Sequence, residues 1–187
     1  MTKTAHGLSA AVVVEFCALC NRVHELWLNH LELFDNNPRN KELINSIAGK
    51  EWVRMSIISQ EYSLLQLIKL HDRAVMNGNI TLGIDYVLTY GGWSDSVRKQ
   101  LESLAKALTG FADNLRGVRN KILSHYDLAT ILANAPLGTF ANGDDLKYFK
   151  DLQEFVDIVY DQVVGGPYPF SCNVKNDIAY FLRTIKP

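Results

Sequence analysis

The stretch SDSVRKQLESLAKALTGFADNLRGVRNKILSH, residues 94–125, carries the clearest structural pattern in this chain. Its apolar residues alternate steps of four and three, at Val97, Leu101, Leu104, Leu108, Phe111, Leu115, Val118 and Ile122. This spacing predicts a long amphipathic helix with an apolar seam like that of a coiled coil. Ser94, just before the first seam residue, is a candidate N-cap for this helix.

Helical periodicity continues along the rest of the chain, and polar or Gly- and Pro-containing stretches interrupt it. We expect a helix over about 8–34 ended by Asp35-Asn36-Asn37-Pro38, a short segment over 39–48, a helix over about 50–76 ended by Asn77-Gly78-Asn79, a helical turn near 84–88, a polar loop over 127–143, a helix from Asp144-Asp145 to Gly165-Gly166-Pro167, and a last helix from Asn173 to about Ile185. No strand stands out. The pattern predicts an all-α fold, a single domain over residues 1–187 built as an antiparallel bundle of about five to six helices.

Composition narrows the class of protein. The chain has 187 residues, 48% of them hydrophobic, which suits one domain with a real core. Its net charge of -1 argues against extended, sequence-independent DNA binding. Three cysteines at no framework spacing indicate a reducing compartment. No apolar run approaches the roughly 20 residues that span a bilayer, so we expect a soluble, cytoplasmic protein without membrane contact.

The end of the long helix carries the groups that point to chemistry. Arg119 and Asn120 are followed, after four residues, by His125. An arginine stays charged and forks onto phosphate oxygens, and a histidine takes or gives a proton near neutral pH. Asn120 supplies an amide that holds a phosphate oxygen or orients the imidazole. These are the groups that cleavage of a phosphodiester needs, and the chemistry requires no metal and no other cofactor.

The spacing also leaves alternatives open. On an ideal helix Arg119 and His125 lie about 120° apart around the axis and about 9 Å apart along it, so they do not meet on one unbroken helix. Either the helix ends near Ser124, or a two-fold dimer through the seam brings the groups together. If the two residues are purely structural, Arg119 pairs with Asp113 or Asp127 and His125 interacts with the helix C-terminus.

The segment from Arg119-Asn120 to His125 resembles the signature of the HEPN superfamily (higher eukaryotes and prokaryotes nucleotide-binding). That signature is an arginine, usually followed by Asn, Asp or His, then a spacer and a histidine. The stretches Lys69-Leu70-His71-Asp72 and Leu82-Gly83-Ile84-Asp85 further resemble the AbiU-like branch, named for abortive infection.

The resemblance implies a bundle of HEPN type and a homodimer with a shared cleft. It further implies metal-independent RNA cleavage of toxin or defence type, with Arg119, Asn120 and His125 as catalytic residues. RNA is then the substrate, and an antitoxin or a nucleotidyltransferase is a further partner. Some toxins of the superfamily have a modified tyrosine two positions after the histidine, but here Tyr126 follows His125 directly and Asp127 takes that position. The alternative is a catalytically inactive HEPN-like module for dimerisation, partner binding or nucleotide binding.

Two other groupings have stronger structural interpretations. Cys17, Cys20 and His24 fall at i, i+3 and i+7, but the second Cys-x-x-Cys usual in zinc sites is missing. Both cysteines lie close to an apolar stripe, so we expect core residues and no bound metal. His71-Asp72 resembles half of a phosphohydrolase motif whose other half has no counterpart, so a hydrogen bond at a helix end is expected.

Overall fold

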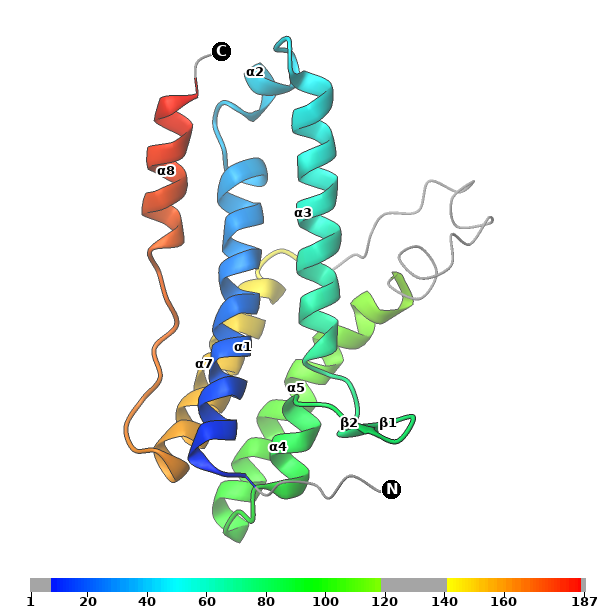
Figure 1. The fold of residues 1–187 in the computed structure, drawn as a ribbon, viewed down its shortest axis with the longest axis vertical. Helices are drawn as coiled ribbons and strands as arrows, with labels where there is room; N and C mark the ends of the chain where they lie inside the picture. Colours follow the sequence, from blue (N-terminus) through cyan, green and yellow to red (C-terminus); the bar gives the residue numbers. More distant parts are fainter. Residues whose placement is uncertain (1–7, 119–140, 186–187) are drawn as a thin grey trace. The chain divides into compact units, whose positions relative to one another are not determined.

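The computed structural model describes residues 8–118 and 141–185 of the chain. Within these residues the structure is almost entirely helical, which confirms the predicted all-α class (Figure 1). The described residues group into two compact units. Of the described residues, the first unit contains 8–20, 67–118 and 141–169, and the second contains 21–66 and 170–185. Each unit is described by itself below.

The first helix ends where its sequence predicted. Helix α1 (Ala10–His30) passes into a π-helical turn, η1 (Leu31–Asp35). The amide of Asn36 donates to the Leu31 carbonyl at 2.7 Å, the wider spacing that defines this turn. The side chain of Asn37 then donates to the Leu33 carbonyl at 3.0 Å and accepts from the Arg39 amide at 2.9 Å. The Asn37 side chain thus helps to stop the helix by taking the place of backbone hydrogen bonds.

The end of α3 (Gly49–Lys69) corrects two expectations. The helix stops at Lys69, not at Met76, and strands β1 (Val75–Met76) and β2 (Asn79–Ile80) form an antiparallel hairpin. Its tip residues, Asn77 and Gly78, have φ angles of 49° and 77°. Two consecutive residues with positive φ make the tight turn that Asn-Gly favours between strands. Asn77-Gly78 is therefore a hairpin signal, and the expectation of a chain without strands is wrong.

The apolar seam that starts at Val97 packs into the interior of the first unit. Helix α5 (Asp95–Val118) starts at the predicted cap, with the Val97 amide donating to the Ser94 hydroxyl at 3.5 Å. It packs along α7 (Asp144–Val163), and α4 (Ile84–Tyr90) packs on α5 as well (Figure 1). The fully buried side chains of this unit include Val13, Phe16, Leu101, Leu108, Leu115, Leu152, Phe155 and Val156.

This packing has a consequence for the expected dimer. The seam residues of α5 from Leu101 to Leu115 face their own chain, because Leu101, Leu108 and Leu115 are at most 1% exposed. Phe16 of α1 adds an edge-on contact to Phe155 of α7, with ring centroids 6.0 Å apart. The surface that we expected to dimerise is therefore covered by α7 along this stretch, and a second copy needs another surface.

The second unit has a smaller aromatic core. Helix α2 (Asn40–Ile44) and helix α8 (Val174–Thr184) both pack on η1. The rings of Phe34 and Trp52 lie 5.0 Å apart, and the Trp52 indole donates to the Asn40 side chain at 2.7 Å. The buried residues of this core are Phe34, Leu43 and Trp52, with Leu33, Leu182 and Ile185 packed against them. Asn173 stands at the start of α8 as predicted, but its side chain makes no capping bond.

Candidate functional site

The predicted catalytic residues Arg119, Asn120 and His125 lie outside the residues that the structure describes, as do Tyr126 and Asp127. The structure does describe the helix that leads to them. Helix α5 continues to Val118, the residue directly before Arg119. The contacts of the last turns of α5 therefore describe the part of the chain directly before the predicted site.

Arg116, which the sequence analysis did not single out, ties the end of α5 to the turn after α3. Its guanidinium donates to the His71 carbonyl at 3.2 Å, and its Nε lies 3.3 Å from a carboxylate oxygen of Asp113. The sequence contains a signal for the Asp113–Arg116 pair, because oppositely charged residues at i and i+3 face each other on a helix. Asp113, one of two acids considered as a structural partner for Arg119, is thus paired with Arg116.

The two stretches that resemble the AbiU-like branch meet in the first unit. The Ile84 amide donates to the Leu70 carbonyl at 2.9 Å, and the Asp85 carboxylate accepts from the Ala74 amide at 2.7 Å. A Cβ at Gly83 would lie 2.7 Å from the Leu70 oxygen, so this approach requires glycine. The two stretches therefore form one backbone junction, which holds α4 beside the turn to which α5 is anchored.

His71 lies inside this junction as a neutral, buried side chain. Its Nε2 is 2.9 Å from the Tyr148 hydroxyl, and the residue is only 8% exposed. Burial, together with the positive charge of Arg116, lowers the pKa of His71 from 6.5 to about 4. The ring is therefore uncharged at neutral pH and serves packing, in agreement with the expected hydrogen bond at a helix end.

This burial predicts a loss of stability in mild acid. Between about pH 6.5 and pH 4 the unfolded chain binds a proton at His71 that the folded chain does not, so stability falls as pH drops through this window. From pH 7 to pH 5, we expect the free energy of unfolding of wild type to fall by about 2 kcal/mol more than that of His71→Gln. Urea unfolding at both pH values measures the difference. Equal losses in the two proteins would contradict a buried, neutral His71.

Cys17 and Cys20 are buried in the first unit, as the apolar stripe predicted. Burial raises the pKa of the Cys17 thiol to about 12, helped by the negative charge of Asp157, and raises that of Cys20 well above 9.0. Both sulfurs therefore stay protonated and behave as small apolar groups. Within residues 8–118 and 141–185, no three His, Cys, Asp or Glu side chains are grouped so that they would hold a metal ion.

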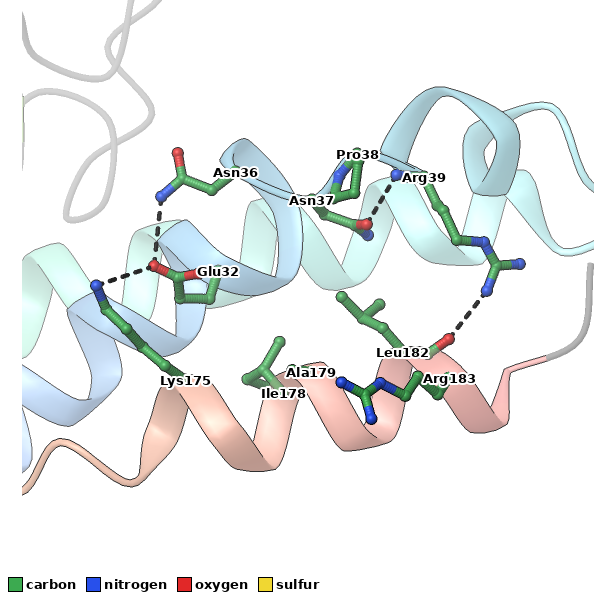
Figure 2. A pocket seen from close by; sticks show the side chains of 10 residues that line it. All are labelled: Glu32, Asn36, Asn37, Pro38, Arg39, Lys175, Ile178, Ala179, Leu182 and Arg183. Atoms are coloured by element: carbon green, nitrogen blue, oxygen red, sulfur yellow. Dashed lines mark hydrogen bonds and ion pairs between the residues drawn. The ribbon is translucent and has the colours of Figure 1, made fainter.

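A separate cavity of about 320 Å³ lies in the second unit, between α8 and the chain from η1 to Arg39 (Figure 2). At one end of the cavity, the Arg39 guanidinium donates to the carbonyls of Leu182 and Ile185 at 2.9 and 3.1 Å. Lys175 lies 3.6 Å from Glu32 at the opposite end. Sequence analysis missed this site, although Lys175, Ala179 and Arg183 recur at the four-residue steps that mark one flank of a helix.

Comparison with protein families places these observations in context. The family model HEPN_AbiU2, described as AbiU2, matches residues 11–182, which covers both AbiU-like stretches and the segment from Arg119 to His125. Comparison with curated proteins and with solved structures gave no significant match. In the described part of the chain, no helix combines the length and the apolar character that crossing a membrane requires.

Proposed function

Because the chain belongs to the AbiU2 branch of the HEPN superfamily, we propose that it is a metal-independent RNA endonuclease of toxin or defence type. One observation carries the proposal: the match to the abortive-infection family spans 11–182 and includes Arg119, Asn120 and His125 at the spacing of the HEPN signature. The fixed end of α5, directly before Arg119, supports it, since a catalytic arginine needs a rigid base.

The three residues divide the work of phosphodiester cleavage. His125 takes the proton of a ribose 2′-hydroxyl or delivers one to the leaving 5′-oxygen. Arg119 stabilises the negative charge that develops on the pentavalent phosphorus. Asn120 holds a phosphate oxygen or orients the imidazole. Arg119 and His125 would not meet on one unbroken helix, so we propose a homodimer in which Arg119 of one protomer and His125 of the other share a cleft.

The dimer in this proposal forms through a surface other than the α5 seam, which α7 covers from Leu101 to Leu115. An antitoxin or a nucleotidyltransferase is the partner that would hold such a nuclease in check. RNA binding through a small local site fits the net charge of -1, because only a few cations need to meet the phosphate.

The test is cleavage without metal. Purified protein should cut single-stranded RNA in the presence of EDTA and leave DNA of the same sequence intact, because the 2′-hydroxyl is the nucleophile. The 5′ fragment should end in a cyclic phosphate or its hydrolysis product. If activity disappears with EDTA, the mechanism is wrong. If a broad panel of RNAs is left uncut, the result favours a catalytically inactive module for dimerisation or for binding a partner or nucleotide.

A further inference from the structure

We propose that the cavity between α8 and residues 32–39 binds a small organic anion with an apolar body, whose anionic head pairs with Arg183. This site is independent of the proposed nuclease function and uses none of its residues. The cavity of about 320 Å³ falls at the lower end of the range typical of small-molecule sites. A carboxylic or phosphoric head on an apolar tail is the class of ligand that its lining matches.

The floor of the cavity is apolar. Ile178, Ala179 and Leu182 contribute it from α8, and Pro38 faces them from the other wall (Figure 2). Ile178 is 9% exposed and so belongs to the packed interior, whereas Ala179 is exposed and has the smallest side chain on the floor. An apolar tail that covered these groups would remove them from water, which favours binding.

The charge at the rim is mostly positive, and one cation is left to pair with a ligand. Lys175 is paired with Glu32, which also accepts from Asn36 at 3.5 Å. Arg39 donates to the carbonyls of Leu182 and Ile185 and pairs with Glu42, 3.1 Å away. Arg183 lines the same cavity.

The guanidinium of Arg183 is therefore the charged group that is left to bind a ligand. In Figure 2 it lies back along α8 beside Ala179, and no dashed line joins it to another labelled side chain. No ion pair or hydrogen bond links it to any residue in the described ranges. An arginine fork in this state matches the two oxygens of a carboxylate or the oxygens of a phosphate.

The walls are held in place without a ligand. Arg39 bridges the η1 side to the last turn of α8 through two carbonyls, and the side chain of Asn37, itself 5% exposed, fixes the loop that carries Arg39. A cavity whose walls are tied together in this way loses little freedom on binding, which favours affinity for a small ligand.

The experiment titrates ¹⁵N-labelled full-length protein with octanoate, octyl phosphate and octanol, and follows amide shifts by NMR. We expect saturable shifts in residues 32–39 and 174–183 with at least one of the two anions, and much weaker binding of octanol, which has the same tail without the charge. The stronger anion identifies the head group. Absence of saturable shifts with both anions, or equal binding of octanol, would overturn the proposal.

Two substitutions locate the site. Arg183→Gln should weaken anion binding about three- to tenfold, the loss expected for one partly exposed charge-assisted contact, and leave octanol unchanged. Ala179→Leu should weaken all three probes by filling the floor. Arg22→Gln, an exposed arginine of α1 outside the cavity, is the matched control and should bind as wild type does. Circular dichroism checks that each variant folds. Wild-type affinity in both cavity variants would show that the probes bind elsewhere.

Discussion

Replacing His125 with alanine is expected to slow RNA cleavage by about 10²–10⁴-fold, the usual contribution of one positioned proton-transfer group. The loss should appear in kcat, because the imidazole acts on the proton in the transition state and adds little to RNA affinity. The measurement is single-turnover cleavage of a labelled single-stranded RNA in EDTA, with wild type and His125→Ala at the same concentration.

Two controls make that result specific. Circular dichroism and urea unfolding should show a folded His125→Ala, because the core residues of α5, from Leu101 to Leu115, are untouched. Lys99→Ala, a change at an exposed position of α5, should cleave at the wild-type rate. Equal rates for His125→Ala and wild type would refute the assignment of His125 as the proton-transfer group.

Arg119→Ala is expected to lower the cleavage rate by about 10²–10³-fold, by analogy with other groups that stabilise transition-state charge. Arg119→Lys should recover part of this loss, because lysine keeps the charge but lacks the fork that contacts two phosphate oxygens. Arg98→Ala, near the start of α5 and far along the chain from Arg119, is the matched control and should retain wild-type activity. A fully active Arg119→Ala would remove arginine from the mechanism.

Mixing the two inactive proteins tests the shared cleft. If each site takes Arg119 from one protomer and His125 from the other, a mixed dimer of Arg119→Ala and His125→Ala contains one intact site. Subunit exchange should then restore part of the activity. A mixture that forms mixed dimers and stays inactive would place both residues of a site on one protomer.

Much of the secondary structure could be predicted because its signals are local. The four-and-three spacing that starts at Val97, the cap at Ser94 and the break at Asp35-Asn36-Asn37-Pro38 each act over a few residues, and the structure has all three. The hairpin at 75–80 is also encoded locally, in Asn77-Gly78, although the apolar periodicity before it favours a longer helix. The burial of Cys17 and Cys20 followed from their place beside an apolar stripe.

For the candidate site, too, some features could be predicted from the sequence and others depend on the folded chain. The types and spacing of Arg119, Asn120 and His125 could be found in the sequence, and their role as a catalytic group stays a prediction, since they lie outside the described residues. By contrast, nothing in the sequence around Arg116 indicated that it would bind the backbone of His71, 45 positions earlier in the chain. Contacts of this kind depend on the path of the chain between the two residues.

The sequence by itself determined that the chain is helical, where most helices begin and end, which faces are apolar, and which family the chain belongs to, because helix periodicity, capping and motif spacing are properties of neighbouring residues. Which apolar faces meet could be seen only in the folded chain. The tertiary structure placed α7 over the seam of α5, set His71 against Tyr148 across 77 positions, and joined Arg39 to the Leu182 carbonyl across 143. Many faces of similar spacing compete to cover one another, and the choice among them is made by the packing and hydrogen bonds of the whole unit.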